Sequence, residues 1–183
     1  MQLFPILEIG WLNGWLPLAF FYGWFGIFLL SCSKPIVKKL YSVSGWTKRE
    51  YLLSGLGKPF SLACIVLMIF TPIDPSTFAF YIGLIRYAIG FAFMFIALFE
   101  FKRMRVNEPV ASGIYQYSRN PQWFGLVLIF TGTALMSANG LAILLFAGIL
   151  ILYHLRILGE ERACLAAYGK AYQDYLNEVP RYF

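Results

Sequence analysis

Apolar stretches separated by short polar segments run along most of the chain. Five of them approach or reach the roughly 20 residues with which a helix crosses a bilayer. They cover residues 11–32, 54–70, 78–99, 121–137 and 141–155. Asn139-Gly140 separates the last two, and because Asn and Gly tolerate positive φ, a tight turn fits there. The pattern therefore predicts transmembrane helices, of which the last two form an antiparallel hairpin.

The final stretch, residues 160–183, has a different pattern. Its apolar side chains recur at spacings of three and four and include Leu165, Tyr168, Tyr172, Tyr175 and Val179. This periodicity predicts an amphipathic helix that is too polar to span a membrane and lies on or near its cytoplasmic surface. The predicted fold is all-α: a polytopic integral membrane protein with about five transmembrane helices and this C-terminal amphipathic helix.

Composition agrees with a membrane protein. Sixty per cent of the residues are hydrophobic and 13% are charged, whereas soluble domains average about 45–50% and about 25%. These values exclude disorder, a coiled coil and most soluble enzymes. The single histidine, His154, excludes a metal site built on several imidazoles, and no metal is expected. Cys32, Cys64 and Cys164 lie in apolar or helical stretches and are expected to be small buried side chains.

Charge indicates the orientation of the chain in the membrane. The net charge is +6, and the basic residues lie between or after the apolar stretches, so membrane topology explains them better than a nucleic-acid partner does. They include Lys34, Lys38, Lys39, Lys48, Arg49, Lys102, Arg103, Arg105, Arg119, Arg162, Lys170 and Arg181. Glu8 and Asp74 fall on the opposite side. The N-terminus is therefore predicted outside and the C-terminus in the cytoplasm.

Arg86 departs from this pattern, because it lies about two helical turns inside the third apolar stretch. A charge within a membrane span is a candidate functional residue by default. Snorkelling toward the outer face, or pairing with Asp74, is the simpler explanation.

Asn120 and Pro121 mark a helix start, because Asn caps free N–H groups and Pro fits the first turn. A helix N-terminus favours anions, and Arg119 adds a full positive charge beside it. On spacing alone, this segment is either a capped membrane helix with an interfacial arginine or an anion site.

A second polar group follows the fifth stretch. Arg156 and Glu160 are four residues apart and share one helix face, while Glu161 shares a face with His154. Adjacent carboxylates at the end of an apolar helix are costly to bury unless they meet a cation. The candidates for that cation are a bound ligand and three basic residues, Arg119, Lys102 and Arg103.

Short motifs follow one another in the second half of the chain and bracket the predicted hairpin. They are Gly113-Ile114-Tyr115, Arg119-Asn120-Pro121-Gln122-Trp123-Phe124-Gly125, Glu160-Glu161, Gly169-Lys170-Ala171-Tyr172-Gln173-Asp174-Tyr175 and Val179-Pro180-Arg181. This ordered set, over about residues 105–183, resembles the membrane-embedded methyltransferase superfamily of isoprenylcysteine carboxyl methyltransferases and phospholipid N-methyltransferases. The eukaryotic carboxyl methyltransferases have His in place of Asn120 and often Tyr in place of Trp123, which leaves the substrate open.

The chain is predicted to form a single membrane domain, residues 1–183, in whose second half the resemblance implies a site. Residues 1–101 would form three N-terminal transmembrane helices, and residues 102–183 the catalytic, cofactor-binding portion. The cofactor would be S-adenosylmethionine, lined by Val110, Tyr115, Asn120, Pro121, Gln122, Trp123 and Glu160. Arg156 and Glu161 would be catalytic, with Arg156 and Arg119 toward the substrate. A carboxylate acceptor needs no general base, whereas for an amine acceptor the candidates are Glu161, Tyr115 and His154.

The function implied is transfer of a methyl group to a lipid or lipidated acceptor, such as an isoprenylcysteine carboxylate, at the cytoplasmic membrane face. One alternative is a phospholipid N-methyltransferase of the same superfamily. Another is an NADPH-dependent sterol reductase, whose C-terminal end the tail from Glu160 to Pro180 also resembles, although those enzymes are longer and have more spans. A non-enzymatic membrane scaffold is a third.

Overall fold

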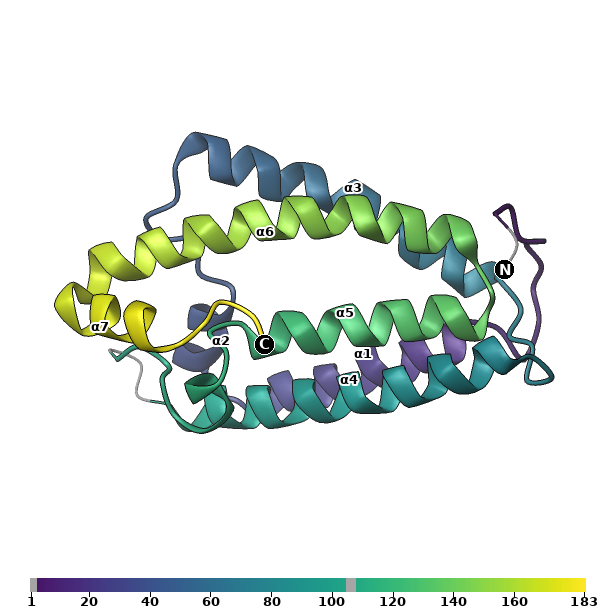
Figure 1. The fold of residues 1–183 in the computed structure, drawn as a ribbon, viewed down its shortest axis with the longest axis horizontal. Coiled ribbons are helices and arrows are strands. Elements are labelled where there is room, and N and C mark those ends of the chain that lie inside the picture. The colour runs from purple at the N-terminus through teal and green to yellow at the C-terminus, as the bar shows by residue number, and fades with distance from the viewer. Residues whose placement is uncertain (1–2, 105–107) are drawn as a thin grey trace.

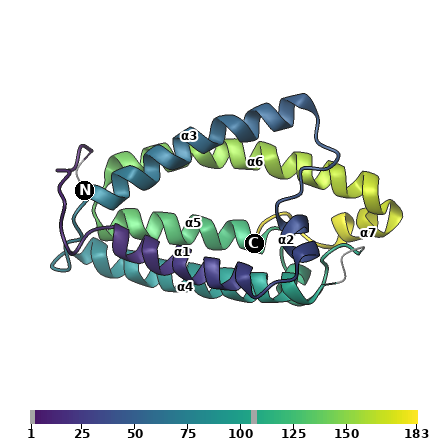
Figure 2. The ribbon, with the colours of Figure 1, turned by 180° about the vertical axis from the view of Figure 1, so that it is seen from behind.

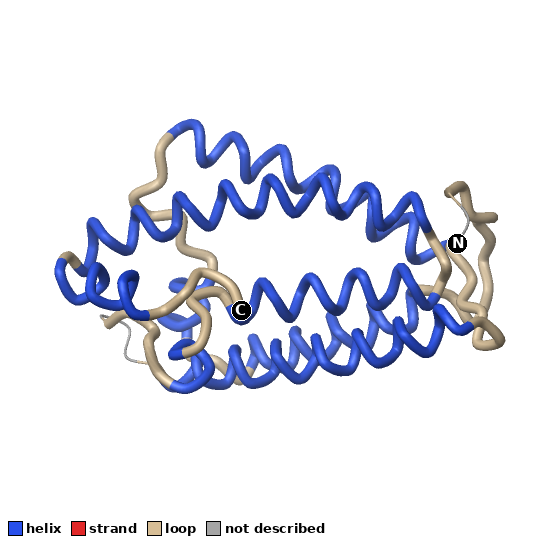
Figure 3. Tube along the Cα trace, viewed as in Figure 1, coloured by secondary structure: helices blue, strands red, loops and turns tan. Residues whose placement is uncertain are grey.

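The computed structural model describes residues 3–104 and 108–183, and the regular elements in these ranges are all helical. They are α1 (Trp15–Leu30), α2 (Lys34–Leu40), α3 (Lys48–Phe70), α4 (Phe78–Arg103), the short 3₁₀ helix η1 (Gly113–Gln116), α5 (Pro121–Met136), α6 (Gly140–Tyr168) and α7 (Lys170–Glu178). Figure 3 shows the long helices with the loops gathered at the two ends. Arg105, one of the residues used for orientation, lies outside the described ranges.

The five predicted apolar helices are present, and the all-α membrane fold is confirmed. Within the described ranges, α3, α4 and α6 are long and apolar enough to cross a membrane. Helices α1 and α5 are shorter, with 16 residues each, or about 24 Å at 1.5 Å per residue. Helix α1 begins later than predicted, because Asn13 pairs with Pro72 in a short bridge and the Gly14 N–H donates to Thr71 O.

The helices form two layers. Helix α3 runs beside α6, whereas α5 runs beside α4 and α1, and both views show this arrangement (Figures 1 and 2). The predicted hairpin of α5 and α6 therefore exists, but its arms diverge and each packs on a different partner. The turn differs in detail from the prediction, because the residue with positive φ is Ala138 (φ 46°). Asn139 instead caps α6, accepting from Ala142 N at 2.8 Å, and donates to Thr71 Oγ1 at 2.8 Å.

Glycines allow α4 and α5 to approach closely. A Cβ atom on Gly132 of α5 would lie 2.7 Å from the carbonyl oxygen of Gly83 on α4, and one on Gly125 would lie 2.9 Å from that of Gly90. Small residues promote such packing in membranes, where apolar burial alone does not drive helices together.

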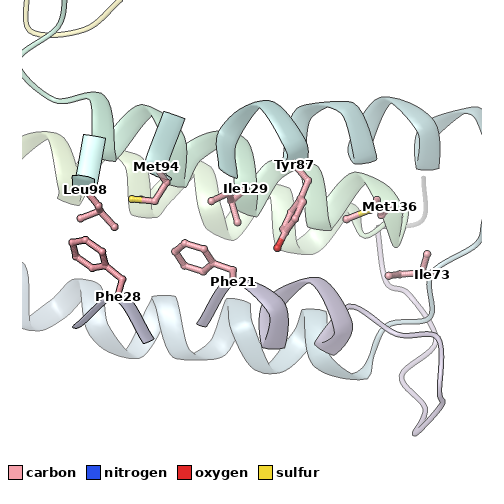
Figure 4. Packing of buried hydrophobic residues seen from close by; sticks show 8 residues of the cluster. All are labelled: Phe21, Phe28, Ile73, Tyr87, Met94, Leu98, Ile129 and Met136. Carbon is pink, nitrogen blue, oxygen red and sulfur yellow. The ribbon is translucent and has the colours of Figure 1, made fainter. Parts of the chain in front are cut away.

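Aromatic side chains of α1 complete this layer. The side chains of Phe21 and Phe28 point toward Met94 and Leu98 of α4 (Figure 4). The Tyr87 hydroxyl donates to Pro17 O at 2.7 Å, which satisfies its polar end inside the layer.

The bounds predicted for the C-terminal amphipathic helix, residues 160–183, are wrong, although an amphipathic helix, α7 (Lys170–Glu178), is present. Helix α6 continues to Tyr168, and the chain then breaks at Gly169, whose φ of 56° lies in the left-handed region that favours glycine. Helix α7 follows and ends before Val179 and Pro180. The apolar stripe folds onto itself, because Tyr172, Tyr175 and Val179 pack together with the end of α6.

The proposed pairing of Arg86 with Asp74 is also wrong. Arg86 Nη2 donates to Thr131 Oγ1 on α5 at 3.2 Å. Asp74 accepts instead from the backbone and hydroxyl of Ser76, at 3.0 and 2.6 Å. The arginine thus joins α4 and α5, while the aspartate stabilises its own turn.

The close approach of α4 and α5 predicts a strong position dependence of Gly→Ala substitutions. Gly132→Ala should lower stability by about 1–3 kcal/mol through overpacking, measured as the melting temperature in detergent. Gly148→Ala is the control, because no atom lies within 4 Å of its added Cβ, and helix propensity favours alanine equally at both sites. Equal effects of the two substitutions would contradict this packing.

Candidate active site

A cavity of about 1140 Å³ lies between the two layers. Its wall changes character along α6, from Phe146 and Ile149 in the middle of the helix to Arg156, Glu160 and Glu161 near its end. The cavity therefore has a charged end near the start of α5 and an apolar part inside the bundle.

The residues predicted for the site all line this cavity. They are Val110, Tyr115, Arg119, Asn120, Pro121, Gln122, Trp123, Arg156, Glu160 and Glu161. They come from the segment before α5, the first turn of α5 and the second half of α6. Among the described residues, no group of three or more His, Cys, Asp or Glu side chains is suited to hold a metal ion.

Glu161 forms an ion triad with two arginines. Arg181 donates from Nε to Oε1 at 3.0 Å and from Nη2 to Oε2 at 2.8 Å, and Arg119 Nη1 lies 3.3 Å from Oε1. The side chains of Glu161 and Arg119 are each only 11% exposed. Of the cations considered for the two carboxylates, Arg119 pairs with Glu161, and Arg181 is a partner that the sequence did not indicate.

The other candidate cations lie elsewhere. Lys102 Nζ donates to Ser31 Oγ at 3.0 Å, and Arg103 lies 3.9 Å from Glu100 on the same helix. Neither pairs with the adjacent carboxylates of α6.

The last residues of the chain fold back over the start of α5. Arg119 N donates to Pro180 O at 3.0 Å, and Ser118 Oγ donates to Arg181 O at 3.2 Å. Pro121 occupies the first turn of α5 as predicted, but Asn120 makes no side-chain capping bond. Its Nδ2 donates instead to Arg181 O at 3.2 Å, so the amide holds the C-terminal segment.

Aromatic contacts continue along this segment. The rings of Trp123 and Tyr182 lie 4.8 Å apart between centroids, and the Tyr182 hydroxyl lies 2.7 Å from His154 Nδ1. His154 is not among the cavity-lining residues in the described ranges. His154 is therefore connected to the cavity only indirectly, through Tyr182, whose ring lies against the cavity-lining Trp123.

Tyr115 is buried below the start of α5. Its hydroxyl accepts from Gln122 Nε2 at 2.7 Å, and its carbonyl oxygen accepts from the Tyr175 hydroxyl at 2.7 Å. Burial raises the pKa of Tyr115, so its hydroxyl stays protonated at neutral pH. Tyr115 is therefore suited to orient Gln122 rather than to take up a proton.

Arg156 and Glu160, which share a helix face as predicted, also form an ion pair, with Nε donating to Oε1 at 2.8 Å. The guanidinium carbon also lies 5.4 Å from the ring centroid of Trp46 and 5.8 Å from that of Tyr153. Trp46 lines the cavity and was missed by sequence reasoning, since an aromatic residue in a basic loop carries no motif. The sequence contains Arg181 as the end of the Val179-Pro180-Arg181 motif, but nothing in that motif predicts its pairing with Glu161.

The buried triad predicts a selective loss of stability. Glu161→Gln should cost about 3 kcal/mol, because it leaves two arginines without their neutralising carboxylate. The melting temperature in detergent measures this. Asp174→Asn, the same chemical change at an exposed position of α7, is the control and should have little effect. An equally small loss with Glu161→Gln would mean that the triad does not hold these segments together.

Comparison with known proteins supports the resemblance. A family model described as phospholipid methyltransferase matches residues 77–171, which is more than half of the chain. The protein-S-isoprenylcysteine O-methyltransferase of Schizosaccharomyces pombe is 32% identical over 80 residues, covering 43% of this chain and 34% of that protein. Protein-S-isoprenylcysteine O-methyltransferase B of Arabidopsis thaliana is 29% identical over 87 residues, covering 47% of this chain and 44% of that protein.

These matches have limited extent. The aligned stretches span less than half of either relative, and no solved structure matches the chain. The family match nevertheless includes the whole of α4, α5 and α6, and with them four charged residues that line the cavity: Arg119, Arg156, Glu160 and Glu161. The superfamily predicted from the motifs is confirmed, and the chain belongs to the phospholipid methyltransferase family.

Proposed function

We propose that the protein is an S-adenosylmethionine-dependent methyltransferase that acts on a lipid or lipidated acceptor at the cytoplasmic membrane face. The observation that carries the proposal is the cavity with a charged end and an apolar interior. A water-soluble cofactor fits the charged end, and the hydrocarbon part of an acceptor fits the apolar part. The volume of about 1140 Å³ exceeds the range of roughly 300–1,000 Å³ typical of pockets for one small ligand.

The polar residues fit the cofactor chemically. Trp123 offers an aromatic face, and Glu160 offers a carboxylate for a ribose hydroxyl or an ammonium group. The resemblance places Arg119 toward the substrate, but its Nε is buried without a hydrogen-bond partner in the described part of the chain, and we assign it instead to donate to the carboxylate of the cofactor. Val110, Tyr115, Asn120, Pro121 and Gln122 would complete the cofactor-binding wall. When bound, S-adenosylmethionine supplies a methyl group on a positively charged sulfur.

The protein's own residues would position the acceptor and exclude water. The apolar wall keeps water from the reacting groups, which favours neutralisation of opposite charges over hydrolysis. Arg156 lies where the wall becomes charged and would orient an acceptor carboxylate by paired hydrogen bonds. Proximity and orientation then account for much of the rate enhancement, without a general base.

The available proton acceptors favour a carboxylate over an amine as acceptor. Methylation of an amine requires a group that removes a proton. Glu161 is engaged with two arginines, Tyr115 stays protonated, and His154 lies outside the cavity lining. We therefore assign Glu161 a positioning role in place of the catalytic role that the resemblance implies. A phospholipid N-methyltransferase is the alternative to be tested, because the matching family model is described as phospholipid methyltransferase.

The orientation follows from the charges. Basic residues gather between α1 and α3, at Lys34 and Lys38 of α2 and Lys48 at the start of α3, and at the end of α4, which carries Lys102 and Arg103. These segments lie at the end of the bundle that holds the charged part of the cavity (Figure 1). Basic residues favour the cytoplasmic side. This end, with the candidate active site, is proposed to face the cytoplasm.

The proposal predicts ligand binding and methyl transfer. S-Adenosylhomocysteine should raise the melting temperature of the detergent-solubilised protein, because it binds the folded state, whereas NADPH should not. Labelled methyl groups should pass to a prenylcysteine rather than to phosphatidylethanolamine. A shift with NADPH alone would favour the sterol-reductase alternative. Label in phosphatidylethanolamine would identify a phospholipid N-methyltransferase, and label only in a total lipid extract would point to another lipid.

Glu160→Gln tests the assigned cofactor wall. The substitution should weaken S-adenosylhomocysteine binding by about tenfold or more, since a hydrogen bond to a charged group contributes about 1.5–3 kcal/mol. Calorimetric titration measures the affinity, and an unchanged circular dichroism spectrum establishes that the fold is intact. Asp174→Asn is the matched control on an exposed face. Unchanged affinity in Glu160→Gln would remove Glu160 from the site.

A further inference from the structure

Trp46 belongs to a part of the chain outside the family match of residues 77–171. It lies between α2 and α3 and lines the cavity. Its ring centroid lies 5.4 Å from the guanidinium carbon of Arg156, and Tyr153, one helical turn before Arg156, lies at 5.8 Å. One arginine of the candidate active site is thus in contact with two aromatic rings.

The loop that carries Trp46 is fixed to α6. Arg162 donates from Nη2 to Gly45 O at 3.0 Å and from Nε to Glu50 Oε1 at 3.1 Å. Glu50 in turn forms a capping box with Thr47 at the start of α3. The position of Trp46 is therefore determined by contacts on both sides of it, one residue before and one after.

Close backbone contacts reinforce this attachment. Gly45 has a φ of 79°, and a Cβ on it would lie 3.3 Å from Ala163 Cβ. A Cβ on Gly159 of α6 would lie 2.8 Å from Glu50 Cδ. The absence of side chains at both glycines lets the loop lie directly against α6, within reach of Arg156.

The contacts leave part of the Arg156 guanidinium available. Its Nε donates to Glu160, and neither terminal nitrogen has a hydrogen-bond partner within residues 3–104 and 108–183. An aromatic face attracts the cation, by about 0.5–2 kcal/mol, but does not use its N–H donors. Trp46 therefore restricts the guanidinium while its terminal N–H groups remain free for a ligand.

We propose that Trp46 is a positioning residue that orients Arg156 to receive a negatively charged oxygen group of the acceptor. The inference deepens the proposed function and rests on it. A planar guanidinium whose Nε edge is held by Glu160 presents its remaining donors in a fork that matches two oxygens. The acceptor class is therefore an anionic amphiphile, with its charged oxygens at Arg156 and its hydrocarbon part in the apolar region of the cavity.

The test compares a carboxylate with its neutral counterpart. S-Farnesylcysteine and its carboxamide differ only at the group proposed to meet Arg156. The wild-type protein should bind the carboxylate about tenfold more tightly, as expected for one charge-assisted hydrogen bond. Trp46→Leu, which keeps an apolar side chain but removes the aromatic face, should abolish most of this preference. Trp46→Phe should retain it, because phenylalanine keeps a ring.

Kinetics provide a second measurement. Trp46→Leu should raise KM for the acceptor and leave KM for S-adenosylmethionine unchanged, whereas a loss of folded protein would lower the apparent kcat and change neither KM. Tyr81→Ala, at an exposed aromatic residue of α4 that is not among the cavity-lining residues in the described ranges, is the control and should change neither.

The outcomes separate this inference from the proposed function. Equal selectivity in Trp46→Leu and Trp46→Phe would overturn the role of the aromatic face. A wild-type protein that binds S-adenosylhomocysteine but does not prefer the carboxylate would overturn the acceptor class and leave the methyltransferase proposal standing. Absence of S-adenosylhomocysteine binding would overturn the proposed function, and with it this inference.

Discussion

The Glu161 carboxylate between Arg119 and Arg181 connects three segments that are distant in the sequence: α6, the segment before α5 and the C-terminal residues. A carboxylate with so little exposure is stable only when it is neutralised and hydrogen-bonded. In a membrane, apolar helix surfaces can contact lipid instead of one another at little cost in free energy. Polar contacts between helices therefore have a larger share in fixing the positions of the helices. The triad also carries one more positive than negative charge, which suits a site for anionic groups.

This tie explains why the hairpin is open in the middle. Helices α5 and α6 are joined at one end by the turn through Ala138 and Asn139, and at the other by the contact of Arg119 with Glu161. Between these points α5 packs on α4 through glycines, while α6 packs beside α3 (Figure 1). Since each arm satisfies its packing elsewhere, the space between them remains as a cavity, which Arg119 and Glu161 line at its charged end.

Local sequence patterns predicted the features that depend on interactions between residues close together in the chain. Hydropathy located the long helices, proline marked the start of α5, and a spacing of four residues placed Arg156 and Glu160 on one helix face. Contacts between segments distant in the sequence could not be predicted from these local patterns. The partner of Arg86 is a threonine on the neighbouring helix, because helix packing decides which side chain lies nearest. The break at Gly169 was missed because the apolar spacing continues unchanged on both sides of it.

The segments outside the family match determine how the matched residues are presented. Arg181 and Tyr182 follow the match and contact Glu161 and Trp123, while Trp46 precedes it and contacts Arg156. The matched region alone would leave Glu161 with one arginine and Arg156 with one aromatic neighbour. On the proposed assignment, residues within the family match meet the cofactor, and the side chains around Arg156 orient the acceptor. It is therefore in these flanking segments that differences in acceptor between related proteins are expected to arise.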